Sequence, residues 1–465
     1  MSHHWCVGLS LFLCAAAAPL GAQQPRPAAP PPQQAAPRPQ TPRPDTLAQR
    51  AVRQDSTLRA QQARLDSLAD RADSLSDAMQ HLQQQLAEQA QSKVGSRLRN
   101  KVEISGLILI NGFYNGAKMN AADVPGWVSR NQDTTGLPNA ALGGLMRQTR
   151  LGVTVSGVRA AGADLGADLQ LDFFSGFPVT GDDRFFTPPR IRTANVRLDW
   201  PHFGLLLGQE APLVSQQNPV SFAQIGWPGF WGAGNLWEWI PQARATYEMG
   251  TAVRVGLQAA ALDPIQTKDE PFATPIGADA GEKSGRPSVE GRVYVDWGDD
   301  ESESVIGVGV HRGWLATTGA ATLTSQAVTA DFRIVLWGTV ALAGEAFSGQ
   351  ALAGLGDGGI DQNFGPLGQP IRTRGGWAQV NVRLVSGWEF GGGYGMDDPD
   401  DTDLLQTGAT LPAGARLKNV VFQGHLHWRP GGGLLVGAEV WRFQTTYPQG
   451  PISASHINVF AGMAF

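Results

Sequence analysis

The chain closes with the stretch SHINVFAGMAF, residues 455–465, in which the character of the side chains changes at every step. One face is apolar and consists of Ile457, Val459, Ala461, Met463 and Phe465. The other face is mixed and consists of His456, Asn458, Phe460, Gly462 and Ala464. Because successive side chains of a strand point to opposite sides, this pattern predicts a β-strand between hydrocarbon and a water-filled lumen. An edge strand of a soluble sandwich is the alternative.

The last residue, Phe465, is aromatic and follows apolar residues at alternate positions. This ending resembles the C-terminal strand of bacterial outer-membrane β-barrels, which the barrel-insertion machinery recognises. The resemblance implies insertion into an outer membrane.

The composition of the 465-residue chain favours one large β-structure with an appendage: it has 58 Gly and 14 Trp, and only 17% of its residues are charged. A formal net charge of -5 gives no reason to expect nucleic acid as a partner. After the first segment, no stretch offers the roughly 18 consecutive apolar residues that a spanning helix needs. If the mature chain spans a membrane, it is therefore predicted to do so as an all-β transmembrane barrel.

The N-terminal segments differ in composition from the rest. Residues 1–22 are predicted to be a signal peptide, with a short membrane anchor as the alternative. Its cleavage removes Cys6 and Cys14, so the mature chain has no thiol chemistry. Residues 23–44 are a Pro-rich linker with no apolar side chain larger than Ala, and are predicted to be disordered.

Residues 45–92 contain neither Gly nor Pro, and their Leu, Ala and Met residues fit a heptad register. The seam is best formed between Leu58 and Leu86, which predicts an oligomerising, periplasmic α-helical coiled coil. A lone amphipathic helix on a domain surface is the alternative.

Residues 101–465 are predicted to form an antiparallel barrel of about 16 strands. The predicted strands are 102–114, 145–157, 163–173, 190–200, 203–210, 242–248, 252–262, 288–297, 303–312, 322–336, 339–350, 374–385, 388–395, 416–428, 434–443 and 455–465. Short connections alternate with long ones, which is typical of periplasmic turns and extracellular loops. The predicted long loops are 115–144, 174–189, 211–241, 263–287, 313–321, 351–373, 396–415 and 444–454. Five tryptophans beside the short turns predict a periplasmic aromatic girdle: Trp200, Trp297, Trp337, Trp388 and Trp428.

Short motifs between Leu145 and Tyr247 carry a family resemblance. They are Arg147-Gln148-Thr149-Arg150-Leu151-Gly152, Leu171-Asp172-Phe173-Phe174, Arg190 and Arg192 ahead of Ala194, Leu207-Gly208-Gln209, and Pro241-Gln242-Ala243-Arg244. This segment resembles the DcaP-like family of outer-membrane porins, with the phosphate-selective porins as a near neighbour. The resemblance implies a homotrimer of 16-stranded barrels, a periplasmic coiled coil and, for the solute, small anions such as dicarboxylates.

Charged side chains on the predicted inner face determine what such a lumen passes. Strand parity predicts that the pore is lined by Arg150, Arg197, Arg244, Arg254, Arg292, Arg333 and Arg383. An arginine ladder concentrates anions, and its loss at Arg150 and Arg244 is expected to lower anion preference. The same face carries the carboxylates of Asp164, Asp168, Asp172, Glu290, Asp296, Asp331, Glu345, Glu389 and Glu439. A lumen of mutually neutralising pairs is therefore the alternative.

The third long loop is the candidate constriction, because it is dense in aromatic residues. They are Trp227, Phe230, Trp231, Trp237 and Trp239. These rings are expected either to line the pore or to pack the loop onto the wall or a trimer contact.

Other signals indicate no enzyme, metal or cofactor. No G-x-S-x-G element is present. The acidic run from Asp397 to Asp403 is better explained as a solvated loop than as a cation site. His425 and His427 share a strand face, but the sequence places no third ligand near them, so they are expected to be polar lumen residues. The sequence therefore predicts a passive porin for small solutes, and the alternative is a structural outer-membrane barrel tethered to the cell wall through its coiled coil.

Overall fold

The structure is a computed structural model, and it describes residues 101–175, 187–264, 278–299, 302–317, 322–405 and 410–465. The predicted signal peptide, Pro-rich linker and coiled coil lie outside the described residues. The chain divides into two compact units, Met1–Gly95 and Ser96–Phe465. The fold below is that of the second unit.

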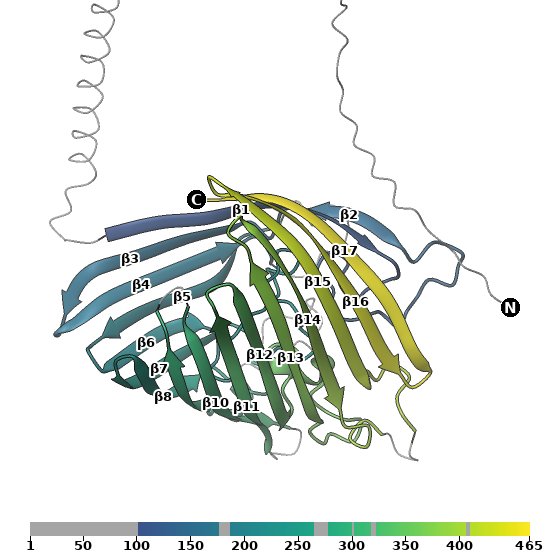
Figure 1. Cartoon of the computed structure of the whole chain (residues 1–465). Helices are drawn as coiled ribbons and strands as arrows, with labels where there is room; N and C mark the ends of the chain where they lie inside the picture. Colours follow the sequence, from purple (N-terminus) through teal and green to yellow (C-terminus); the bar gives the residue numbers. More distant parts are fainter. Residues whose placement is uncertain (1–100, 176–186, 265–277, 300–301, 318–321, 406–409) are drawn as a thin grey trace, which may run out of the picture. The chain divides into compact units, whose positions relative to one another are not determined.

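Antiparallel strands make up the second unit (Figure 1). They are β1 Lys101–Asn115, β2 Ala141–Leu145, β3 Arg150–Ala160, β4 Ala163–Asp172, β5 Arg190–Asp199, β6 Phe203–Glu210, β7 Ile240–Gly250, β8 Val253–Leu262, β9 Ser288–Trp297, β10 Ser304–Ala316, β11 Thr322–Leu336, β12 Val340–Gln350, β13 Arg372–Arg383, β14 Trp388–Pro399, β15 Lys418–Gly431, β16 Leu434–Tyr447 and β17 Gly450–Ala464. Short helical turns are η2 Glu282–Ser284, η3 Ala353–Leu355 and α2 Gly358–Asp361. Among the described residues, no helix is long and apolar enough to cross a bilayer.

Each strand pairs with its neighbours in the sequence, and β1 pairs with β17 to close the ring. The closing register runs from Leu107 opposite Ala464 to Asn115 opposite His456. At the seam, the backbones of Gly106 and Phe465 exchange two hydrogen bonds. The chain thus forms a barrel without a free edge, as the terminal strand pattern predicts.

Strands β2 and β3 occupy one position in the ring, because both pair with β1. The 17 strands therefore make a 16-stranded barrel, which confirms the predicted number. The single predicted strand 145–157 is wrong in one respect, since Met146–Thr149 interrupts it. The break lets Gln148 leave the sheet and bond to a loop inside the barrel.

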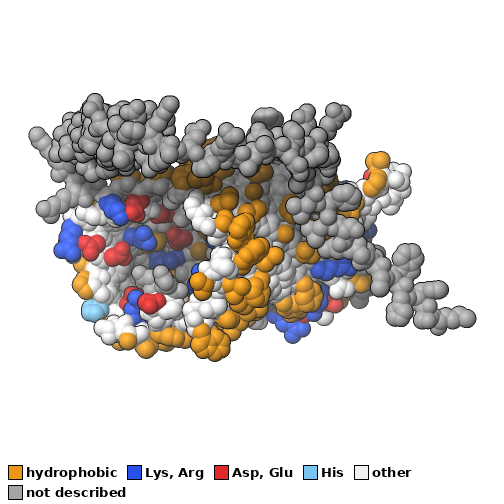
Figure 2. Space-filling view, turned by 45° about the horizontal axis from the view of Figure 1, so that its top comes forward, with side chains coloured by type: hydrophobic (Ala, Val, Ile, Leu, Met, Phe, Trp, Pro, Cys, Tyr) orange, Lys and Arg blue, Asp and Glu red, His pale blue; other side chains and the backbone are white. Residues whose placement is uncertain are grey.

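The barrel is apolar outside and polar inside, the reverse of a soluble β-sandwich. On β1, Ile108 and Ile110 are each 51% exposed, whereas Leu109 between them is 0% exposed. Asn458 and Glu439 are both 0% exposed and face inward. Figure 2 shows the apolar side chains spread over the outer wall, and charged side chains of both signs around a hollow.

The turns follow the predicted alternation, with two corrections. The predicted long loop 313–321 is shortened to residues 317–321, because β10 continues to Ala316. Residues 444–454 do not form a long loop, because β16 and β17 continue until only Pro448-Gln449 separates them. Thr445, Tyr447 and Ala454 are buried inside the barrel, and this burial explains the extra length of both strands. Trp388 and Trp428, opposite each other beside a short turn, stack with ring centroids 5.5 Å apart.

Candidate functional site

Residues 211–239 connect β6 to β7 and form loop L3, which crosses the interior of the barrel. Three carboxylates of the wall anchor it by accepting hydrogen bonds from its backbone. Glu290 on β9 accepts from Leu213 N at 2.6 Å, and Glu345 on β12 accepts from Gln217 N at 2.7 Å. Glu439 on β16 accepts from Ser221 Oγ, Phe222 N and Ala223 N at 2.8, 2.5 and 3.2 Å.

Two glutamines of the wall hold L3 in the same way. Gln379 on β13 accepts from Val220 N at 2.7 Å and donates to Val220 O at 2.9 Å. Gln148, in the interrupted strand, accepts from Ile225 N and Gly226 N at 2.6 and 3.0 Å. L3 is therefore fixed around the wall at several separate places, which include these five residues and also Asn111, Arg192 and Asn419.

The aromatic side chains of L3 are mostly buried. Trp227, Phe230, Trp231 and Trp237 are between 1% and 6% exposed. Their contacts run to other loops and to the wall: Trp227 packs on Phe174, Trp231 on Trp127 and Phe230 on Trp441, with ring centroids 5.1–5.3 Å apart. Trp239 is half-buried, with the Arg192 guanidinium 4.2 Å from its ring centroid. Of the two roles expected for these rings, lining the pore or packing the loop onto the wall, the contacts match the second.

Four of the seven predicted pore-lining arginines are engaged within the wall. Arg292 is buried and pairs with Asp331 at 2.6 Å. Arg254 pairs with Asp296 at 2.7 Å, and Arg383 pairs with Glu389 at 3.0 Å. Arg244 donates to Gln242 Oε1 and to the carbonyl oxygen of Ala211 at the base of L3.

The other three have no recorded ion pair among the described residues: Arg150, Arg197 and Arg333. Arg150 is half-buried, whereas Arg197 and Arg333 are exposed. Arg150 lies opposite Leu107, and Arg197 lies opposite Leu206, two residues buried inside the barrel. Directly opposed residues share a face, so both arginines face the lumen. Arg150 also lines a cavity of about 630 Å³ together with Gln170, Phe222 and Arg429.

The acidic run near the long loops is largely paired. Asp397 is buried and accepts from Gly359 N, Asp398 pairs with Arg374 at 3.0 Å, and Asp403 pairs with Arg372 at 2.8 Å. Asp401 lies in the loop after β14, where partial burial and the charges of Asp398 and Asp400 raise its carboxyl pKa.

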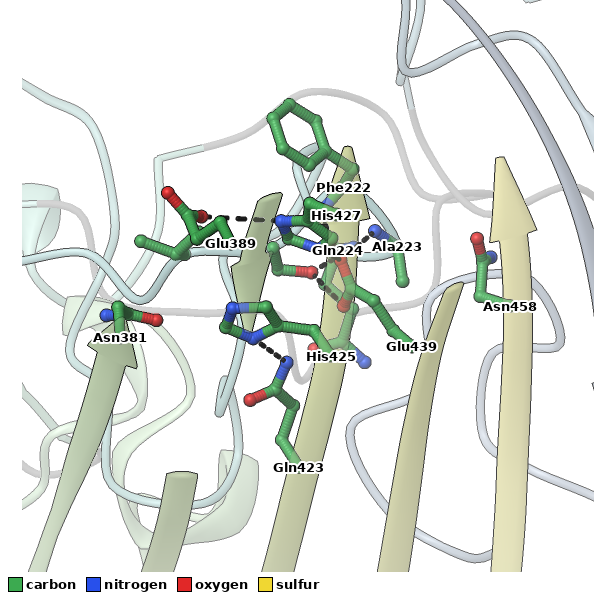
Figure 3. Close-up of polar contacts among 12 residues, drawn as sticks. Phe222, Ala223, Gln224, Asn381, Glu389, Gln423, His425, His427, Glu439 and Asn458 are labelled. Carbon is green, nitrogen blue, oxygen red and sulfur yellow. Dashed lines mark hydrogen bonds and ion pairs between the residues drawn. The ribbon is translucent and has the colours of Figure 1, made fainter. Parts of the chain in front are cut away.

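A second polar cluster lies on the inner wall of β14, β15 and β16 (Figure 3). His425 and His427 lie on the same face of β15, as expected, and the structure adds Glu389 from β14 and Glu439 from β16. One ligand-type atom each of Glu389, His425 and His427 lie within 4.8 Å of one another.

Comparison with known proteins supports the fold. No family model and no curated protein sequence matches the chain. Among solved structures, the outer membrane channel DcaP of Acinetobacter baumannii matches with a TM-score of 0.59 at 15% identity, covering 79% of this chain and 97% of that one. OprB of Pseudomonas putida and an anion-selective porin from Comamonas acidovorans follow at TM-scores of 0.48 and 0.47, with 10% and 16% identity. They cover 78% and 79% of this chain, and 94% and 100% of their own chains.

The chain has the fold of an outer-membrane porin. The resemblance to DcaP-like porins inferred from the motifs between Leu145 and Tyr247 holds at the level of this fold. Within the porin fold, the sequence placed three of the carboxylates that organise the interior on the inner face and Gln148 in a family motif, but it did not reveal that they bind L3. Glu290, Glu345, Glu439 and Gln148 bind L3, and the only available signal was their inward parity on strands that face a Gly- and Pro-rich loop.

Proposed function

We propose that this protein is a porin of the bacterial outer membrane that lets small hydrophilic solutes diffuse passively, with a preference for small anions such as dicarboxylates. The observation that supports this most is the set Arg150, Arg197 and Arg333, inward cations without an ion pair among the described residues, in a barrel with an apolar exterior. A guanidinium keeps its charge and binds a carboxylate through two parallel N–H groups, so free guanidinium groups attract such solutes.

L3 is the proposed constriction. It spans the lumen between β9 and β16, and its anchors hold it against the wall. Hydrogen bonds to the wall carboxylates hold the backbone of L3 in one position. L3 therefore narrows the lumen as a fixed constriction and does not act as a mobile gate. The width left beside L3 sets the size of solute that passes.

Homotrimer formation, contact with outer-membrane lipid and a periplasmic coiled coil belong to the same proposal. The exposed apolar side chains of the outer wall, such as Ile108 and Val459, favour contact with hydrocarbon. The heptad register in residues 45–92 favours association of chains.

A structural barrel, tethered to the cell wall through its coiled coil, is the second candidate. The observation in its favour is the amount of apolar packing within the barrel. Trp127, Trp227, Trp231 and Trp237 form one buried cluster with Phe174, Ile360 and neighbouring side chains from several loops. An interior filled by packed apolar side chains is also expected of a barrel that transports no solute.

Planar-bilayer recording of the purified full-length protein separates the two candidates. A porin for anions gives stepwise currents, in groups of three if trimeric, and a reversal potential on the anion side under a salt gradient. A cation-side reversal potential contradicts the anion preference, and absence of current from protein shown to be inserted contradicts the porin itself. Deleting residues 23–92 should preserve conduction if the protein is a porin. If the protein is a structural tether, the deletion should abolish its attachment to the cell wall.

A further inference from the structure

The polar cluster on β14–β16 contains three buried atoms without hydrogen bonds. Glu389, His425 and His427 are 1%, 7% and 0% exposed. Among the described residues, Glu389 Oε1, His425 Nε2 and His427 Nδ1 have no hydrogen-bond partner. A buried polar atom without a partner costs free energy, so three at one place are candidate ligand atoms.

The remaining atoms of these side chains are held in place by neighbours. Glu389 Oε2 accepts from Arg383 Nε and Arg429 Nη1, at 3.0 and 3.1 Å, which leaves Oε1 directed toward His427 Nδ1 at 3.4 Å. In Figure 3 the carboxylate of Glu389 points at the edge of the His427 ring, with His425 stacked beneath it. The two rings are nearly parallel, with centroids 4.3 Å apart.

Glu439 sets the tautomer of His427. Its Oε1 lies 3.2 Å from His427 Nε2, and a carboxylate there binds the N–H form of that nitrogen. Nδ1 then carries either a second proton, which makes His427 an imidazolium paired with both carboxylates, or a lone pair that faces the negative Oε1 of Glu389. Two acceptors at this distance repel each other unless a cation lies between them. A carboxylate on the far nitrogen of a histidine is also the usual outer support of a metal-binding imidazole.

The geometry points to a divalent transition-metal site formed by Glu389 Oε1, His425 Nε2 and His427 Nδ1, with Glu439 as the positioning residue. Two imidazoles and one carboxylate suit Zn²⁺ and its neighbours in the first transition row rather than Ca²⁺ or Mg²⁺. Three protein ligands leave a fourth position open to water or to a solute. The site has no counterpart in the sequence expectation, which lacked a third ligand for the two histidines.

Binding requires two rearrangements. The lone pairs of the stacked His425 and His427 rings lie in nearly parallel planes, so one ring must turn before both nitrogens point at one ion. Donor atoms about 2.1 Å from one ion lie no more than about 4.2 Å apart, so the ligands must turn slightly toward each other from their 4.8 Å envelope. His425 must also carry its proton on Nδ1, which lies 2.9 Å from Gln423 Nε2. Gln423 presents its amide oxygen to that nitrogen only after a half-turn of its terminal group, which breaks the 3.1 Å hydrogen bond that Gln379 Nε2 donates to Gln423 Oε1.

The site adjoins L3, because Glu439 also accepts from Ser221, Phe222 and Ala223. The Phe222 ring lies against His427 with centroids 5.0 Å apart. An ion bound to His427 therefore stiffens the contact between L3 and the wall. Arg383 and Arg429 offset part of the negative charge, so they weaken the attraction of the site for a cation.

The test is calorimetric titration of ZnCl₂ into the full-length protein in detergent, purified without a histidine tag and stripped with a chelator. We expect one Zn²⁺ per chain, and a visible-region d–d spectrum when Co²⁺ is used instead. His425→Ala and Glu389→Gln should each weaken Zn²⁺ binding at least tenfold. The matched control is His311→Ala, which removes a buried lumen histidine that has a carboxylate partner, Glu290, 2.9 Å away but belongs to no such trio.

A rescue variant distinguishes a ligand from a merely structural residue. His425→Cys supplies a thiolate ligand, so it should restore Zn²⁺ binding relative to His425→Ala and strengthen the binding of Cd²⁺. Circular dichroism checks that each variant keeps its strand content. Absence of Zn²⁺ binding by the wild-type protein, or equal loss in His311→Ala, overturns the proposal. Binding is measured without any current, so it stands or falls separately from the porin function.

Discussion

The inner wall contains two sets of charged side chains with the same strand parity and opposite roles. The carboxylates of Glu290, Glu345 and Glu439 are buried and bind the backbone of L3. The guanidinium groups of Arg150 and Arg197 have no ion pair among the described residues. The difference teaches that a charged side chain can face the lumen without acting on passing solutes. A carboxylate whose oxygens already accept hydrogen bonds from backbone N–H groups stabilises the wall instead.

The strongest way to test this comparison is to remove a carboxylate that accepts hydrogen bonds from L3. Glu439→Ala leaves Ser221 Oγ, Phe222 N, Ala223 N and Trp441 Nε1 without their acceptor. Each buried donor left unpaired costs about 1–3 kcal/mol, so we expect a large loss of stability and a detached L3. Thermal unfolding should occur well below the wild-type temperature, and single-channel recording should show higher, noisier conductance.

Glu303→Ala is the control for that variant, since Glu303 pairs with Arg254 while half of its side chain is exposed. Exposed ion pairs contribute about 0–1 kcal/mol, so its unfolding temperature and conductance should match the wild type. Equal behaviour of Glu439→Ala and Glu303→Ala would show that the wall carboxylate does not hold L3.

The second test separates a paired arginine from a free one. Arg292→Gln leaves Asp331 buried without its cation, which costs about 3–5 kcal/mol. Removing both charges, in Arg292→Gln with Asp331→Asn, should recover most of that stability in chemical denaturation. The reversal potential of the double variant should equal that of the wild type, because the net charge of the lumen is unchanged. A shift toward cations in the double variant would place Arg292 in the conducting path.

The sequence allowed the barrel to be predicted because each of its determinants is local. Alternation at Ile457, Val459 and Met463 sets the face of a strand, and Gly- and Pro-containing turns set its ends. The committed roles of Glu345 and Glu439 could not be predicted, since their partners lie about 130 and 218 residues away in L3. The contact between Glu389 and His427 could not be predicted for the same reason, because only the pairing of β14 with β15 brings them together.

The third test concerns the free arginines that carry the proposed anion preference. Arg150→Gln with Arg197→Gln removes two lumen cations while no recorded ion pair is broken, so the unfolding temperature should change little. The reversal potential under a salt gradient should move toward the cation side. Arg244→Gln is the matched comparison, because Arg244 is bound to Gln242 and to the carbonyl of Ala211 at the base of L3. An equal selectivity shift in Arg244→Gln would show that hydrogen bonding does not remove an arginine from the pore.

The smallest effect is expected for Arg333→Gln, and its dependence on salt distinguishes it from Arg150→Gln. Arg333 is exposed near the short-turn end of β11, whereas Arg150 is half-buried beside the cavity that Phe222 lines. Salt screens exposed charges over about 10 Å at 0.1 M and over about 3 Å at 1 M, but screens partly buried charges much less. The selectivity change of Arg333→Gln should therefore vanish in molar salt, while that of Arg150→Gln persists. If both vanish together, Arg150 lies in open solvent and L3 does not narrow the lumen beside it.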